Sequence, residues 1–211
     1  RNFTVTENLV HDVLIESLAQ VKKAAALANV KVGALDEEMG ALIVKASDEI
    51  KDGLHQKEFI TPAIQGGAGT SINMNMNEVI ANRVAQLKGE ALGSYTYCHP
   101  NDHVNKAQST NDVIPTAGKI ATLKLSETLI KEVEKAIQEF DRLHIETKHI
   151  LKVGRTHLQA AVMISMGEVL GSFGTLFKRD LKRLETSLEE LKTINMGATA
   201  VGTGINTHPD Y

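Results

Sequence analysis

Hydrophobic residues recur every three or four positions along four long stretches of this 211-residue sequence. Such spacing places them on one face of an α-helix. We therefore expect helices over about residues 7–32, 35–50, 120–143 and 167–195. Gly53 suits the end of the second helix, and the third stretch contains neither Gly nor Pro. No stretch alternates apolar and polar residues for long enough to predict a strand, so the expected fold class is all-α.

The length of these helices indicates how they pack. Helices of roughly 25 to 30 residues are much longer than the usual ~11 to 12. Apolar seams such as Leu170, Phe177 and Leu184 typically pack into an extended bundle, often shared between subunits. We expect an N-terminal, mostly helical domain over residues 1–110 and the first part of a long-helix bundle over residues 111–211. The start at Arg1 without Met and the loop-like end at residues 207–211 predict a fragment, truncated at both ends.

Composition excludes several classes of function. The net charge of -3 gives no basic surface for nucleic acid and no polybasic membrane anchor, and aromatic residues make up only 4%. No apolar run approaches the ~20 residues of a membrane-spanning helix. The single cysteine, Cys98, cannot form an internal disulfide, and we interpret it as a small buried hydrophobic residue. This usage fits the cytoplasm.

Four polar, glycine-containing segments separate the helices, at residues 66–77, 98–111, 153–159 and 197–206. Binding groups usually lie on such connections. In the first segment, three glycines precede Thr70 and Ser71, a composition that suits either an anion-binding nest or an ordinary turn. The Lys of a phosphate-binding Walker loop is missing there. Residues 202–206 lack the third glycine of a dinucleotide fingerprint, so we predict no cofactor.

The second and third segments place small hydrogen-bonding side chains before long helices. One of Ser109, Thr110 and Asn111 could be a simple N-cap, but three exceed that need, and a helix N-terminus suits a carboxylate. Thr156 and His157 occupy the same kind of position before the fourth helix. Two histidines four residues apart lie at 99 and 103, but no third ligand is suitably spaced, so we predict no metal site.

Together the segments 66–82, 99–112, 154–159 and 196–206 resemble, in order and spacing, the motifs of the aspartase/fumarase superfamily. The Gly-Ala-Gly-Thr-Ser sequence at 67–71 resembles the version found in its aspartases. This resemblance implies reversible deamination of L-aspartate to fumarate and ammonia, by a homotetramer whose active sites are shared between subunits. The alternatives are a class II fumarate hydratase, which uses fumarate and malate, and a non-catalytic helical assembly protein supported only by the long seams.

The resemblance also implies the residues of a dicarboxylate site. Thr70, Ser109 and Thr110 match positions that hold the β-carboxylate, and His157 would orient the substrate or relay a proton. The substrate-binding residues implied are Thr70, Ser71, Ser109, Thr110, Asn111, Thr156 and His157. A possible second anion site comprises His99, Asn101 and Asp102. No cofactor or metal is implied.

The sequence departs from the superfamily pattern in two places. The catalytic base of the family is a serine on a mobile Gly-Ser-Ser loop, and this sequence contains no Gly-Ser-Ser. After Gln159 the family usually has Asp-Ala-Val-Pro, whereas Ala160 to Met163 here are Ala-Ala-Val-Met. The second change is expected to alter how Thr156 and His157 are held.

Overall fold

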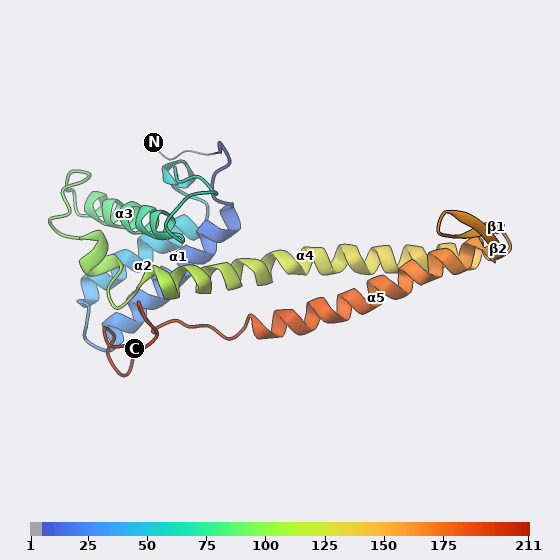
Figure 1. Ribbon diagram of the computed structural model, residues 1–211. Coiled ribbons are helices and arrows are strands. Elements are labelled where there is room, and N and C mark those ends of the chain that lie inside the picture. Colours follow the sequence, from blue (N-terminus) through green and yellow to red (C-terminus); the bar gives the residue numbers. More distant parts are fainter. Residues whose placement is uncertain (1–5) are drawn as a thin grey trace. The chain divides into compact units, whose positions relative to one another are not determined.

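The computed structural model describes residues 6–211, which form two compact units. One unit extends to Thr122 and includes Ile194–Tyr211, and the other is Leu123–Thr193. The division falls inside one continuous helix, α4 (Thr110–Glu146), drawn in green to yellow in Figure 1. This division reflects contacts within one chain alone. It does not test the domain boundary expected after residue 110, which stays a prediction. Among the described residues, no helix combines the length and apolar character needed to cross a bilayer.

The first unit is built on α1 (Asp12–Lys31), α2 (Glu37–Lys51) and α3 (Thr70–Leu87). Two short helical turns, η1 (Gln56–Glu58) and η2 (Pro100–Val104), interrupt its connections. Leu18 of α1, Ile43 of α2 and Ile80 of α3 are fully or almost fully buried in one apolar core. The first two predicted helices are therefore confirmed, with α1 beginning five residues later than the expected residue 7.

Helix α3 was not predicted, because residues 66–77 were assigned to a connection. The helix begins at Thr70, so most of that polar segment is helical. Its buried face includes Asn73 and Asn77 as well as Met76 and Ile80. Amides at core-facing positions conceal the apolar periodicity by which an amphipathic helix is found.

The second unit pairs the later part of α4 with α5 (Met166–Glu190), which run side by side in Figure 1. Glycines of α5 allow a close approach, since a Cβ at Gly171 would lie 2.7 Å from His144 Nδ1 and one at Gly174 would lie 3.1 Å from Phe140 Cβ. The rings of Phe140 and Phe177 are 5.4 Å apart. The third and fourth predicted helices are thus confirmed. Together with the helices of the first unit they confirm the all-α fold class.

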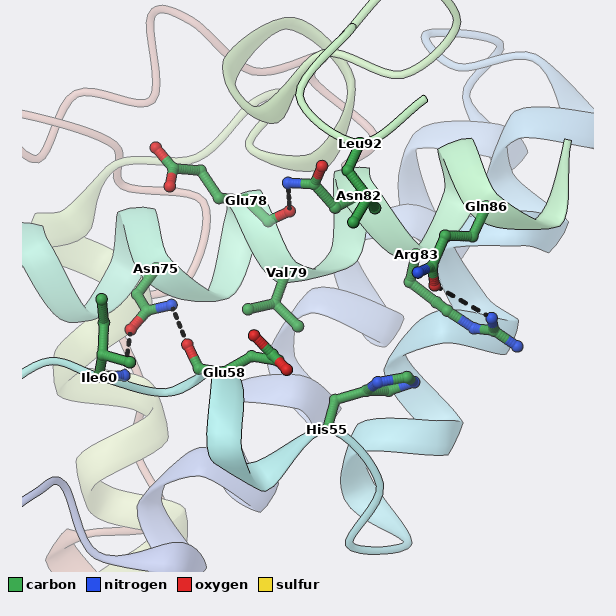
Figure 2. A pocket seen from close by; sticks show the side chains of 10 residues that line it. All are labelled: His55, Glu58, Ile60, Asn75, Glu78, Val79, Asn82, Arg83, Gln86 and Leu92. Atoms are coloured by element: carbon green, nitrogen blue, oxygen red, sulfur yellow. Dashed lines mark hydrogen bonds between the residues drawn. The ribbon is translucent and has the colours of Figure 1, made fainter. Parts of the chain in front are cut away.

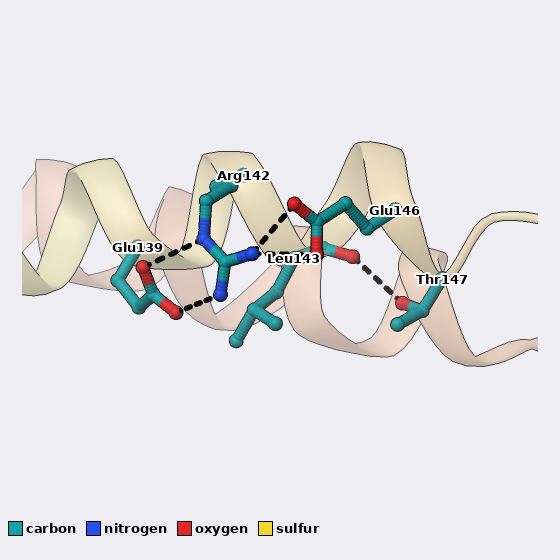
Figure 3. A network of polar contacts seen from close by, with 5 residues as sticks. All are labelled: Glu139, Arg142, Leu143, Glu146 and Thr147. Atoms are coloured by element: carbon teal, nitrogen blue, oxygen red, sulfur yellow. Dashed lines mark hydrogen bonds and ion pairs between the residues drawn. The ribbon is translucent and has the colours of Figure 1, made fainter.

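The outer face of α4 in this unit carries charged residues that pair along the helix. The Arg142 guanidinium lies between the carboxylates of Glu139 and Glu146, one turn before and one turn after it (Figure 3). All three side chains are about half exposed, so solvent screens these ion pairs and they add little to the stability of the helix.

A β-hairpin connects α4 to α5, so the expectation of no strands was wrong. Its strands are β1 (Leu151–Thr156) and β2 (Gln159–Ser165), paired antiparallel with an irregularity between Val153 and Arg155. Most residues of both strands are exposed. With little surface to bury, neither strand needs the alternation of apolar and polar residues that identifies strands in sequence.

Candidate active site

The N-terminus of α4 is closed by a reciprocal pair of capping bonds. Ser109 Oγ accepts a hydrogen bond from the N–H of Asn111 at 3.2 Å, and Asp112 Oδ1 accepts from the N–H of Ser109 at 2.9 Å. This resembles a capping box, with Asp in place of Glu or Gln and with the serine accepting from the second helical residue instead of the third. Ser109 therefore acts as a cap, the role that the sequence left open for one of residues 109–111. Its hydroxyl hydrogen is still available for a ligand.

Asp112 also fixes the fourth polar segment against α4. Its buried carboxylate accepts, through Oδ2, the N–H of Gly197 at 3.2 Å and of Thr199 at 3.0 Å. Several hydrogen bonds to an ionised carboxylate compensate for its burial. The second and fourth polar segments, about 85 residues apart in sequence, thus meet at the N-terminus of α4.

Asn111 strengthens the same junction. Pro115 has no N–H, so the Asn111 carbonyl cannot receive its helical bond four residues later. Asn195 Nδ2 donates to that carbonyl at 3.1 Å, while Asn111 Nδ2 donates to the Ala200 carbonyl at 2.7 Å. Asn111 is one of the predicted substrate residues. In this chain its side-chain amide has a structural role, since it holds the junction together.

The first polar segment reaches α4 through Gly69. Its φ of +88° favours glycine, and an added Cβ would lie 2.9 Å from Ile114 Cγ2. The α3 N-terminus therefore lies directly against the first turns of α4. Asn73 Nδ2 of α3 donates to Thr110 Oγ1 at 3.2 Å. Gly69 provides no side chain to cap α3, and exposed Thr70 and Ser71 follow it in the first turn.

These contacts leave the hydroxyl hydrogens of Ser109 and Thr110 free to donate to a ligand. Ser109 Oγ and Thr110 Oγ1 each accept one bond from an N–H group, and a hydroxyl keeps one O–H to donate. Both side chains are half-buried, at a place where the N-termini of α3 and α4 meet. Helix N-termini carry a partial positive charge and free N–H groups. The arrangement can bind a carboxylate.

Thr156 and His157 lie in the second unit, at the tip of the hairpin. Thr156 pairs with Gln159, so His157 and Leu158 form the two-residue turn, with φ of 49° and 64°. Positive φ at both positions is the pattern of a type I′ turn, which usually takes Asn or Gly. His157 and Leu158 are exposed, and backbone strain of this kind is found preferentially at functional sites. Their predicted role at the substrate stays a prediction.

The possible second anion site lies at the start of η2. His99 Nδ1 accepts the N–H groups of Asn101 at 3.2 Å and Asp102 at 3.3 Å, as an N-cap does. His103 Nδ1 accepts the His99 N–H at 2.8 Å, which accounts for the spacing of the two histidines. The three residues of this predicted site do lie together. Their anion binding is untested.

A buried lysine is the main feature that the sequence interpretation missed. Lys22 is completely buried in α1 and donates to Asn105 Oδ1 and to Gln108 Oε1, both at 2.9 Å. Burial lowers the pKa of Lys22 to about 7, against a smaller opposing effect of the Asp112 carboxylate. The signal was present, because Lys22 lies four residues after Leu18 on the apolar face of its helix.

A separate cavity of about 390 Å³ lies between α3 and the segment around η1 (Figure 2). Asn75 on its wall accepts from the N–H of Ile60 at 3.1 Å and donates to the Glu58 carbonyl at 3.0 Å. This amide therefore tethers a connection. None of the predicted substrate residues lines the cavity.

Two further predictions concern Cys98 and metal ions. Cys98 is 1% exposed and burial raises the pKa of its thiol to about 12, which confirms a buried hydrophobic role. Within residues 6–211, no three side chains of His, Cys, Asp or Glu gather as metal ligands.

Known proteins resemble this chain over its full length. A family model described as lyase matches residues 1–211. An aspartate ammonia-lyase from Bacillus sp is 51% identical over 210 residues, which cover 100% of this chain and 45% of that protein. A class II fumarate hydratase from Prochlorococcus marinus is 42% identical over 206 residues, 97% of this chain and 44% of that protein.

Solved structures share the fold. The fumarate lyase:delta crystallin from Brucella melitensis, bound to cobalt, is 43% identical with a TM-score of 0.89, over 100% of this chain and 46% of that one. The class II fumarase from Schistosoma mansoni is 34% identical with a TM-score of 0.86, over 99% and 44%. The chain thus spans less than half the length of these relatives. With its motifs and its helical architecture matched in this way, the chain belongs to the lyase family and, within it, to the aspartase/fumarase superfamily.

Proposed function

We propose that the full-length protein is an aspartate ammonia-lyase, which converts L-aspartate reversibly into fumarate and ammonia. The observation that carries this proposal is the junction of the α3 and α4 N-termini, where Ser109 and Thr110 keep hydroxyl hydrogens free for a carboxylate. The 51% identity to an aspartate ammonia-lyase supports this choice of substrate.

The chemistry explains why such donors are useful. Removing the Cβ proton of aspartate places negative charge on the β-carboxylate, which becomes an enediolate. Donors fixed around that carboxylate stabilise this charge more than they stabilise the bound substrate. Thr70, Ser109 and Thr110 would serve in this way, since small hydroxyls held at helix ends need little reorganisation. Thr156 and His157 would orient the amino group of the substrate.

The assembly belongs to the same proposal. Apolar side chains of the second unit are about half exposed within one chain, such as Leu129 at 51% and Phe173 at 46%. Seams of this kind suit burial against further long helices. We propose a cytoplasmic homotetramer in which each active site combines segments from different subunits.

The assay that tests the activity uses the full-length protein with L-aspartate, with fumarate plus ammonium, and with L-malate. We expect fumarate to form from aspartate at least a hundred times faster than from malate. A class II fumarate hydratase is the second candidate, supported by the 42% identity to such an enzyme. Faster turnover of malate would overturn the ammonia-lyase and establish this hydratase.

A substitution tests the proposed site. Thr70→Val removes one hydroxyl donor and should lower aspartate turnover at least tenfold, because one oxyanion donor is worth ~10²–10³ in rate. The tetramer should persist in size-exclusion chromatography with light scattering. Thr96→Val, at an exposed connection of the same unit, is the matched control and should keep the wild-type rate. Wild-type turnover in Thr70→Val would remove Thr70 from the site.

A further inference from the structure

The side chain of Lys22 determines the orientation of two amides next to the proposed site. Its nitrogen carries three hydrogens as an ammonium and two as a neutral amine, so it can donate to both partners on either side of its pKa of about 7. Both of its partners, Asn105 and Gln108, therefore present their carbonyl oxygens to it, at 2.9 Å each. Gln108 in turn donates through Nε2 to the carbonyls of Val104 and Lys106, both at 3.0 Å. One buried amine thus contacts the oxygens of two side-chain amides in the segment that precedes α4.

A chain of hydrogen bonds continues from this amine to the proposed substrate hydroxyl. Asn105 Oδ1, which accepts from Lys22, also accepts from Asn73 Nδ2 at 3.2 Å. The same Asn73 nitrogen donates to Thr110 Oγ1 at 3.2 Å. An amide nitrogen carries two hydrogens, so both bonds can form at once. Thr110 Oγ1 is thereby an acceptor on its protein side.

We propose that Lys22 is a positioning residue, which acts through Asn105 and Asn73 to keep the Thr110 hydroxyl hydrogen directed at the bound carboxylate. The inference rests on the proposed function, in which Thr110 donates to the β-carboxylate. It extends that function to a residue that touches no substrate itself.

The alternative orientation of Asn73 explains why the lysine is needed. Asn73 Oδ1 is buried and has no hydrogen-bond partner among the described residues. If the amide of Asn73 turned over, this oxygen could accept the Thr110 hydrogen and withdraw it from the substrate. The turned amide would also place its oxygen against Asn105 Oδ1, which Lys22 holds in place. Without Lys22, the bond that still fixes the Asn105 amide runs from its Nδ2 to the Gln108 carbonyl at 3.4 Å. A bond of that length is weak, so Asn105 turns more easily and the reversal of Asn73 is no longer opposed by a firmly held oxygen.

A purely structural role for Lys22 predicts something different. A buried amine costs several kcal/mol to desolvate, and an apolar residue of similar length often packs equally well. If Lys22 only filled space, its loss would change stability and would reduce activity independently of Thr110. If it acts through Thr110, its loss has no further effect once the Thr110 hydroxyl is absent.

The test is a double-mutant cycle in the full-length enzyme, with kcat and KM for L-aspartate measured for Lys22→Met, Thr110→Val and the double variant. We expect kcat/KM to fall at least thirtyfold in Thr110→Val and about tenfold in Lys22→Met. The double variant should lie within threefold of Thr110→Val. Lys23→Met is the matched control, because Lys23 is a neighbouring, partly exposed lysine paired with Asp48, and it should stay within twofold of wild type.

The outcomes distinguish failure of the hydrogen-bond chain from Lys22 through Asn105 and Asn73 to Thr110 (the relay) from failure of the proposed site. A thirtyfold or greater loss in Thr110→Val, followed by a further tenfold loss in the double variant, would overturn the relay and leave the proposed function intact. Wild-type activity in Thr110→Val would overturn both the role of Thr110 and the relay. Wild-type activity in Lys22→Met would overturn the relay alone.

A second pair of variants keeps the proposal testable if Lys22→Met does not fold. Asn105→Leu breaks the same chain one step later and should replace Lys22→Met in the cycle with the same non-additivity. Both variants lose the 3.4 Å bond from Asn105 Nδ2 to the Gln108 carbonyl, but Asn105→Asp keeps the oxygen that Lys22 and Asn73 contact. It should therefore keep Asn73 donating to Thr110 and stay within threefold of wild type. An equal loss in Asn105→Leu and Asn105→Asp would contradict the relay.

Discussion

Asp112→Asn tests the junction that organises the α4 N-terminus. The buried carboxylate accepts the N–H of Ser109 through one oxygen and the N–H groups of Gly197 and Thr199 through the other. Asparagine keeps only one of these oxygens and places an N–H group on the other side. At least one charge-assisted bond, worth about 1.5–3 kcal/mol, is therefore lost. Removing the negative charge also lowers the pKa of Lys22 further, because Asp112 raises it.

Hydrogen exchange measures this loss where it occurs. A decrease of about 2 kcal/mol in the free energy of local opening accelerates exchange about thirtyfold, since 1.4 kcal/mol corresponds to a factor of ten. We expect this change by mass spectrometry in peptides covering residues 109–113 or 197–203, depending on which side the amide oxygen faces. Asp210→Asn removes an exposed carboxylate charge outside the junction, a few residues after the fourth polar segment, and should leave both peptides unchanged. Unchanged exchange in Asp112→Asn as well would refute this account of the junction.

Three further predictions follow from single residues. Gly69→Ala should destabilise the protein by more than about 1 kcal/mol in thermal unfolding, because φ at this position is positive and the added Cβ meets Ile114. Gly66→Ala, where a Cβ would lie in open space, should not destabilise it. Equal effects of the two substitutions would contradict this reasoning. The unfolded chain keeps the Lys22 proton up to about pH 10.5 and the folded chain only to about 7, so the free energy of unfolding rises with pH in between. Urea titrations of the wild-type protein should show that the free energy of unfolding increases by up to about 2 to 3 kcal/mol between pH 7 and 9. The same titrations of Lys22→Met should show no such increase. The raised pKa and burial of Cys98 predict that iodoacetamide labels it at pH 8 only after unfolding, and rapid labelling of the native protein would disprove this.

Much of the fold was predictable because long helices repeat the same signal many times. The stretch 120–143 lies inside α4, and the fourth stretch matches α5 to within one residue at its start. Helix α3 and the hairpin were missed for opposite reasons. Helix α3 buries amides such as Asn73 on its core face, while the hairpin buries too little of its surface to impose a pattern.

The candidate site was predictable residue by residue but not as a set of contacts. The polar segments containing Ser109, Thr110 and Thr70 were identified from composition and motif. Their connections depend on long-range pairs, such as Asn73 with Thr110 and Asp112 with Thr199. No local pattern encodes such pairs, because they require the helices to be packed first.

The central claim is that the hydroxyls at the α4 N-terminus bind one carboxylate of a small diacid. A crystal structure of the full-length protein with succinate tests this most directly. We expect Ser109 Oγ and Thr110 Oγ1 within about 3 Å of the same carboxylate, as hydrogen bonds require. We expect Thr156 and His157 of the hairpin near the opposite end of the ligand. Succinate bound in an ordered site that excludes both Ser109 and Thr110 would contradict the account.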